Sequence, residues 1–270
     1  MNKTILITGA TDGIGYATIQ MLLDTDNVLI IHGRTKEKVE DTLSKLNRLP
    51  HKAILKGVYA DLTDFSQIKS LIDDVHSSYD KIDVLINNAG VYNTALTRTK
   101  DDLETRFVVN AIAPYYLTKS LLNIMGGESR VINLSSAAQS SVDMQALTKY
   151  TLLNPSEAYA QSKLALTMWS CKMGSEFINI NNKPSIIAVN PKSFLGSKMV
   201  KDAYGVAGHD IRIGADVLCR AALSTEFENA SGLYFDNDQG RFANPHPDAL
   251  NKNLTSLIMD KMDKLIENLT

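Results

Sequence analysis

The stretch from Thr4 to Gly15 reads TILITGATDGIG, in which a run of β-branched and apolar residues passes directly into a glycine-rich turn. The run predicts a short buried strand, and apolar residues at three- and four-residue spacing over Ile14–Leu23 predict a helix behind the turn. A strand, a glycine turn and a helix in this order are typical of the first unit of a doubly wound α/β sheet.

The rest of the chain repeats this alternation. Helix-length stretches include Val39–Leu49 and Phe65–Val75, the second behind Asp64 as a predicted N-cap. We expect a parallel sheet of about seven strands with helices on both faces, and a single domain over residues 1–270 because no repeat or linker divides the chain. Short, evenly apolar runs predict further strands, buried on both faces, at Val28–Ile31, Ile54–Tyr59, Val84–Ile86, Val131–Leu134, Ile186–Val189 and Leu233–Phe235.

Composition excludes several classes of function. Of the 270 residues 44% are hydrophobic, enough to bury one full core, and 28 basic against 30 acidic residues provide no basic field for a nucleic-acid backbone. No apolar run is long enough to span a bilayer, and no apolar leader precedes Thr4. Five scattered histidines without paired cysteines predict no metal site. We expect a cytoplasmic protein with neither a membrane nor a nucleic acid as partner.

The glycine turn has the pattern of a phosphate-binding loop. Gly9 permits a tight turn, Gly13 lets backbone N–H groups approach a pyrophosphate, and Gly15 lets the helix pack close to the sheet. The N-terminus of the helix then faces the anion. Taken alone, the three glycines also suit an ordinary glycine-rich turn between a strand and a helix, which is the alternative to a phosphate-binding loop.

The end of the second predicted strand indicates which dinucleotide is bound. An acidic residue at this point normally binds the ribose hydroxyls of NAD, but the sequence reads His32-Gly33-Arg34. Gly33 leaves room, and the planar, permanently charged fork of Arg34 suits a 2′-phosphate. We therefore favour NADP(H) over NAD(H). The negative charge of Asp12 is mildly unfavourable to the added phosphate. The alternative interpretation of Arg34 is a solvated arginine on the protein surface.

Two Tyr–Lys pairs share a four-residue spacing that places both side chains on one helix face. The charge of Lys163 would favour the phenolate of Tyr159 and lower its pKa, which makes that phenol a general acid or base. A predicted strand ends upstream at Ser135-Ser136, where a serine can hydrogen-bond a substrate carbonyl. No such strand end serves Tyr115 and Lys119, so we interpret that pair as structural.

Amides complete the pattern. Asn88-Ala89-Gly90 follows the fourth predicted strand, and Asn110 lies within the next helix. A buried asparagine is costly without a partner, so we expect a backbone carbonyl or a water at Asn110.

Together these segments, over residues 3–240, resemble the short-chain dehydrogenase/reductase family of single-domain Rossmann enzymes. The resemblance implies that Asp61 and Leu62 contact adenine, and that Asn88, Ala89 and Gly90 line the adenosine ribose. The full set of predicted cofactor-binding residues is Gly9, Thr11, Gly13, Ile14, Gly15, Arg34, Asp61, Leu62, Asn88, Ala89, Gly90, Tyr159, Lys163 and Pro191.

The same resemblance implies a catalytic tetrad of Asn110, Ser136, Tyr159 and Lys163, with the second serine of the pair chosen. The implied reaction moves a hydride between nicotinamide and a carbonyl carbon, while Tyr159 gives or takes the proton at oxygen. In this assignment Ser136 steadies that oxygen, Lys163 holds the nicotinamide ribose, and Asn110 retains a water.

Three segments depart from the simplest family members. The interval from Ser136 to Tyr159 is longer than in the simplest members, and the additional residues Ser140–Asn154 would lie beside the entrance for the substrate. A long insertion at this point is similar to that of the retinol-dehydrogenase-like branch. Asn190-Pro191-Lys192 stands where Asn-Pro-Gly is normal, which puts the path of that loop in doubt. Ser197 lies near the position where a threonine commonly meets the nicotinamide carboxamide.

Two further segments, in the last third of the chain, have recognisable patterns. Residues 193–210 resemble a mobile substrate lid with apolar residues, although the same residues would also suit a packed surface helix. Residues 252–269 predict an amphipathic helix that docks on its own domain or on a partner subunit. The apolar lid residues are Phe194, Leu195, Met199, Val200 and Tyr204.

The leading hypothesis is an NADP(H)-dependent enzyme acting on a small-molecule carbonyl or alcohol. The alternative is a non-enzymatic NADP(H)-binding redox sensor on the same fold, against which the intact tetrad argues. Epimerase or dehydratase chemistry is disfavoured by the glycine spacing. By resemblance, a homodimer or homotetramer would form through the helices that carry Asn110 and Tyr159.

Overall fold

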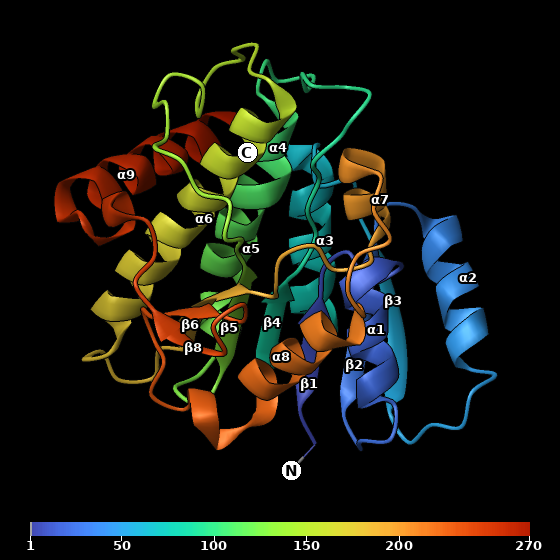
Figure 1. Cartoon of the computed structure of the whole chain (residues 1–270). Helices are drawn as coiled ribbons and strands as arrows, with labels where there is room; N and C mark the ends of the chain where they lie inside the picture. Colours follow the sequence, from blue (N-terminus) through green and yellow to red (C-terminus); the bar gives the residue numbers. More distant parts are fainter. Residues whose placement is uncertain (1) are drawn as a thin grey trace.

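The computed structural model describes residues 2–270, and only the backbone of Lys198, Ala203 and Tyr204. This part of the chain forms one eight-stranded sheet in the order β3-β2-β1-β4-β5-β6-β7-β8 (Figure 1). Every pairing is parallel except that of β7 with β8. The strands are β1 Thr4–Ile7, β2 Val28–Gly33, β3 Ile54–Tyr59, β4 Val84–Asn87, β5 Arg130–Leu134, β6 Ser185–Asn190, β7 Tyr234–Asp236 and β8 Arg241–Ala243.

Helices cover both faces of the sheet, as predicted (Figure 1). Side chains of successive strand residues point to opposite faces, so the sheet separates two apolar clusters. Leu6 and Leu85 pack with α3, α5 and α6, whereas Ile5 and Ile7 pack with α1 and α8. The helices are α1 Gly13–Leu22, α2 Lys36–Leu46, α3 Phe65–Ser78, α4 Thr105–Phe107, α5 Ala113–Leu121, α6 Pro155–Phe177, α7 Lys198–Tyr204, α8 Arg212–Leu223 and α9 Lys252–Leu269.

Local signals set most of these boundaries. Asp64 accepts from the N–H of Ser66 and begins α3, as predicted. The helix predicted over Val39–Leu49 begins earlier, at Lys36, because the Thr35 side chain accepts a hydrogen bond from the N–H of Lys38 and caps α2 there.

Two predictions about strands need correction. β3 is not buried on both faces, since Ile54 and Tyr59 are 53% and 54% exposed. It lies at the edge of the sheet and has only β2 as a neighbour, so part of its surface faces solvent. The antiparallel strand β8 was not predicted, because Arg241–Ala243 is short and has an exposed residue and no long apolar run.

The C-terminal helix α9 docks on its own chain, one of the two predicted outcomes. It packs against α6 (Figure 1). The side chains of Ile258 and Met262 are fully buried there. Over residues 2–270, no helix combines the length and apolarity that crossing a membrane requires.

Candidate functional site

The glycine turn has the geometry that its sequence predicts. Gly9 has φ +62°, and a Cβ there would lie 2.8 Å from the Cα of Ala89, so no larger residue fits. Gly13 has φ +59° and open space in the direction of a Cβ. A Cβ at Gly15 would lie 2.5 Å from Asn88 Nδ2, which confirms that close packing requires a glycine there. The open side at Gly13 leaves room for an anion at the N-terminus of α1.

Asn88 braces this turn from the end of β4. Its Nδ2 donates to the carbonyl oxygens of Thr8 at 2.8 Å and Gly9 at 3.0 Å. The N–H groups of Asn88 and Ala89 both donate to Thr8 Oγ1. These hydrogen bonds join the turn after β1 to the segment after β4. The two strands are neighbours at the point where the strand order of the sheet reverses.

The residue that completes the brace, His32, was missed by sequence reasoning. It is buried at the end of β2, its Nδ1 accepts from the N–H of Gly9 at 3.2 Å, and its Nε2 lies 3.1 Å from the carbonyl oxygen of Ala60. Burial lowers the pKa of His32 to about 4, so the ring is neutral and donates through Nε2. Its position at the end of the second strand was the available signal.

A cavity of about 510 Å³ extends from the glycine turn to Tyr159. It brings most predicted site residues together, but Gly15, Asn110 and Ser136 do not line it. Sequence reasoning missed several lining residues, among them His32, Lys38, Tyr92, Asn93 and Asp202. The predicted residues that line the cavity are Gly9, Thr11, Gly13, Ile14, Arg34, Asp61, Leu62, Asn88, Ala89, Gly90, Tyr159, Lys163 and Pro191.

Two cations lie at the end of the cavity where β2 passes into α2. Arg34 and Lys38 line it, and Arg34 is exposed. The expectation that Gly33 leaves room for the cofactor was wrong, because a Cβ there would lie 2.5 Å from Thr11 Cγ2. Gly33 is needed for the packing of Thr11 against β2. Asp12 accepts from the N–H of Gly13 at 2.7 Å as the N-cap of α1, so that amide is already engaged.

Tyr159 and Lys163 lie together on α6 at the other end of the cavity. Lys163 Nζ is 5.6 Å from the centroid of the Tyr159 ring and donates to the carbonyl oxygen of Leu134 at 2.7 Å. Burial lowers the pKa of Lys163 to about 8, because removing an ammonium from water disfavours its charged form. A titratable lysine and a phenol therefore share the wall of the cavity.

Asn110 lies on a π-helical turn, Val108–Ile112. Its Oδ1 accepts from the N–H of Val91 at 2.8 Å, and its Nδ2 donates to the Val91 carbonyl at 2.9 Å and to Ser162 Oγ at 2.9 Å. The predicted backbone-carbonyl partner is confirmed. A Cβ at Gly90 would lie 3.4 Å from both Asn110 Oδ1 and Lys163 Nζ, so these two groups flank the same glycine.

The two serines after β5 differ in what their hydroxyls contact. Ser135 is buried, lines the cavity, and its Oγ lies 2.6 Å from Thr167 Oγ1. Ser136 is partly exposed, and its Oγ accepts from the N–H of Ala138 at 3.1 Å. An accepting hydroxyl keeps its own proton to donate, so Ser136 has the freer donor although Ser135 lies nearer the cavity.

The loop after β6 is strained where the sequence departs from the family pattern. Lys192 has φ +117° and Phe194 has φ +53°, values that favour glycine. Asp238 holds the loop, accepting from the N–H and the Oγ of Ser193 at 3.0 and 2.6 Å. Lysine thus occupies a conformation for which the family's glycine is the ordinary choice.

The predicted lid contains α7. Ser197 caps this helix by accepting from the N–H of Val200 at 3.2 Å, and Ser197, Met199 and Asp202 line the cavity. Leu195 is buried and Phe194 is half exposed. The side chain of Tyr204, also assigned to the lid, lies outside the described residues.

With fold and site in place, comparison with known proteins identifies the family. Residues 3–204 match the family model of the short chain dehydrogenases, so the chain belongs to this family. Human polyprenol dehydrogenase is 28% identical over 256 residues, covering 88% of this chain and 78% of the relative. Mouse retinol dehydrogenase 13 is 25% identical over 282 residues, covering 98% and 84%.

Solved structures show the same fold. An uncharacterized protein from Mycobacterium paratuberculosis superposes with a TM-score of 0.79 at 21% identity, covering 98% of this chain and 93% of that one. The NADP active-site complex of RhlG from Pseudomonas aeruginosa superposes with a TM-score of 0.67 at 22% identity, covering 87% and 94%. At these identities the likeness concerns the fold.

Proposed function

We propose that this chain is an NADP(H)-dependent oxidoreductase that interconverts a small-molecule carbonyl and its alcohol. One observation carries the proposal: a glycine turn shaped for a pyrophosphate and a Tyr159–Lys163 pair with a buried lysine line the same cavity. A binding module would need only the first of these features, which is why we favour an enzyme over the redox sensor.

The residues fit a nicotinamide dinucleotide. The space beside Gly13 and the N-terminus of α1 suit a pyrophosphate, while Asp61 and Leu62 line the cavity where adenine would lie. Arg34 and Lys38 supply positive charge for a 2′-phosphate. NADP-bound structures among the neighbours, such as that of RhlG, support the same assignment. When bound, the nicotinamide supplies or accepts the hydride at the carbonyl carbon.

The chain's own groups manage the proton and the oxygen. Tyr159 donates a proton to the carbonyl oxygen in reduction and removes it in oxidation. Ser136 donates a hydrogen bond to that oxygen and orients it. The charge of Lys163 stabilises the phenolate form of Tyr159. Asn110 joins the loop at Val91 to α6 through Ser162, and in this proposal it also retains a water near Lys163.

Fluorescence titration with NADPH and NADH tests the cofactor assignment. We expect tighter binding of NADPH, and Arg34→Ala should weaken NADPH binding by about tenfold or more while leaving NADH unaffected, because one charged hydrogen bond to phosphate is lost. Arg48→Ala is the matched control, since Arg48 is exposed and does not line the cavity. Equal binding of the two cofactors by the wild type would contradict the assignment.

A panel of aldehydes, ketones and quinones tests the reaction. We expect the wild-type protein to oxidise NADPH with at least one member of the panel. Tight NADPH binding without turnover of any member would favour the redox sensor instead.

The homodimer or homotetramer remains a prediction. α9 packs on α6, one of the helices through which family members commonly pair, so pairing there must leave room for α9 or use a different face. Light scattering of the full chain decides this, and a monomer at micromolar concentration would contradict the prediction.

A further inference from the structure

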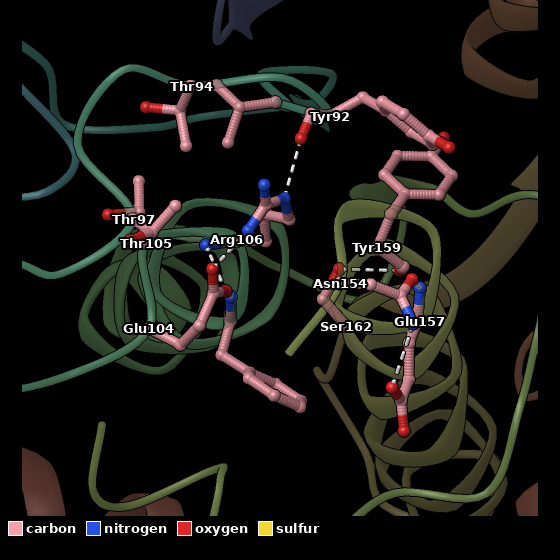
Figure 2. Close-up of polar contacts among 12 residues, drawn as sticks. Tyr92, Thr94, Thr97, Glu104, Thr105, Arg106, Asn154, Glu157, Tyr159 and Ser162 are labelled. Atoms are coloured by element: carbon pink, nitrogen blue, oxygen red, sulfur yellow. Dashed lines mark hydrogen bonds and ion pairs between the residues drawn. The ribbon is translucent and has the colours of Figure 1, made fainter. Parts of the chain in front are cut away.

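A buried ion pair lies beside the candidate site and has no part in the proposed chemistry. Glu104 and Arg106 are each about 1% exposed and form an ion pair across α4 (Figure 2). Glu104 also accepts from the backbone N–H groups of Arg106 and Phe107, which makes it the N-cap of α4. A buried ion pair is costly to assemble, and removing one partner leaves an uncompensated buried charge that destabilises the protein.

The guanidinium of this pair is directed at one backbone atom outside α4. Arg106 Nε donates to the carbonyl oxygen of Tyr92 at 2.6 Å (Figure 2). Tyr92 is buried, whereas its neighbours in the loop after β4 are half-buried, as Val91 is, or exposed, as Asn93 is. The Arg106 contact therefore fixes the backbone of Tyr92 within this loop.

The side chain of Tyr92 is held as well. Its hydroxyl lies 2.6 Å from Ser156 Oγ, which belongs to the first turn of α6, three residues before Tyr159. Residues three apart on a helix lie on the same face. The rings of Tyr92 and Tyr159 are in contact, with centroids 5.0 Å apart and planes inclined at 54° (Figure 2). Both residues line the cavity.

We propose that Tyr92 is a positioning residue that fixes the orientation of the Tyr159 ring in the cavity. The backbone contact with Arg106 and the hydroxyl contact with Ser156 restrain Tyr92 at both ends, so its ring forms a rigid surface against Tyr159. A phenol that transfers a proton needs its oxygen within hydrogen-bond reach of the reacting oxygen, and small misplacements are costly in rate. The inference deepens the proposed function and, in its kinetic part, rests on it.

Kinetics of Tyr92 variants test the proposal. Tyr92→Leu removes the ring, and we expect kcat to fall by about tenfold to a hundredfold with an unchanged Kd for NADPH. Tyr92→Phe keeps the ring and should restore most of kcat. In a Tyr159→Phe background, Tyr92→Leu should have no further effect on kcat, because the residue through which it acts is absent.

The matched control is Tyr150→Phe. The Tyr150 hydroxyl lies 3.0 Å from Thr97 Oγ1, a contact of the same kind, between the same loop after β4 and the segment before α6. Tyr150 does not line the cavity, so we expect kcat to be unchanged. A loss of kcat in Tyr92→Leu no larger than in Tyr150→Phe would overturn the proposal.

A second measurement is independent of turnover. NMR of protein labelled at tyrosine Cζ, with the Tyr159 signal assigned by its absence in Tyr159→Phe, reports the environment of that phenol. We expect Tyr92→Leu to shift this signal and Tyr150→Phe to leave it in place. An unshifted signal in Tyr92→Leu would overturn the proposal even if the kinetics agreed. An inert wild type would defeat the proposed function, and the NMR result would then decide the positioning role alone.

Discussion

Two Tyr–Lys pairs with identical spacing lie on neighbouring helices, and the structure places them in different surroundings. On α6, Lys163 is buried at the cavity wall, and this burial lowers its pKa. On α5, Tyr115 Oη and Lys119 Nζ both bind Asp263 of α9, at 2.8 and 2.7 Å. The interpretation of the second pair as structural is confirmed. A four-residue spacing places two side chains on one helix face. What lies against that face, α9 in one pair and the cavity in the other, determines which contacts the side chains make.

The surroundings of the two phenols explain the difference. Burial, together with the hydrogen bond to the Asp263 carboxylate, raises the pKa of Tyr115 above its ordinary value. A phenol beside a carboxylate stays protonated, and its hydrogen bond attaches α9 to the core. Tyr159 instead has an ammonium donor, Lys163, near its ring and a cavity in front of it.

The largest difference between the pairs should appear on removal of the phenol hydroxyl. We expect Tyr159→Phe to lower kcat by roughly a hundredfold to ten-thousandfold, the usual contribution of general acid–base catalysis. Tyr115→Phe should leave kcat unchanged and cost about 1 kcal/mol of stability, because one hydrogen bond to Asp263 is lost. Steady-state assays and urea unfolding check both outcomes. A comparable loss of kcat in the two variants would remove the distinction between the pairs.

The second difference concerns the pH dependence of stability without cofactor. Folding lowers the pKa of Lys163 from 10.5 to about 8, so between these values the unfolded chain binds the proton and the folded chain does not. Stability contributed by this group is therefore lowest below pH 8 and rises as the pH increases toward 10.5. Relative to Lys163→Met, the wild type should gain about 3 kcal/mol over this window.

Urea unfolding of both proteins at several pH values measures that gain. A difference between wild type and Lys163→Met that stays constant with pH would show that the lysine is not desolvated in the folded chain. Lys119→Met provides the comparison from the other pair. Its side chain is 42% exposed, so its ion pair with Asp263 should contribute less than about 1 kcal/mol at neutral pH.

A small effect, on stability alone, is expected at Asp263, which belongs only to the structural pair. Asp263→Asn keeps the shape of the side chain but removes the carboxylate charge to which Lys119 and Tyr115 both donate. We expect a stability loss of about 1 kcal/mol with kcat unchanged. Thermal unfolding and the carbonyl assay measure these quantities. A large loss of activity would mean that α9 affects the site, contrary to the separation of the two pairs.

The contrast between the two pairs also shows which features of the site can be predicted from the sequence. The glycine turn was predicted because it depends on local conformations, at Gly9 and Gly13, that few other residues adopt. The cavity wall at Tyr159 and Lys163 followed from helix periodicity and a strand end. Such features need only short-range geometry.

Contacts between residues distant in the chain could not be predicted. The brace from His32 to Gly9, the Arg106 contact with Tyr92 and the Tyr92–Tyr159 ring contact each join segments that only the folded chain brings together. The strained loop at Lys192 was suspected from its sequence, but the Asp238 contact that holds it comes from a different strand connection. Side-chain packing determines these features, and periodicity does not encode it.

The central claim is that a carbonyl carbon is reduced from nicotinamide while Tyr159 provides the proton. Its most direct test is isotope transfer from NADPH that carries deuterium at both C4 positions, with the best substrate of the panel. We expect the wild type to form an alcohol with one deuterium on the former carbonyl carbon, and Tyr159→Phe to form almost none in the same time. An alcohol without deuterium, or equal product from the two proteins, would contradict the account.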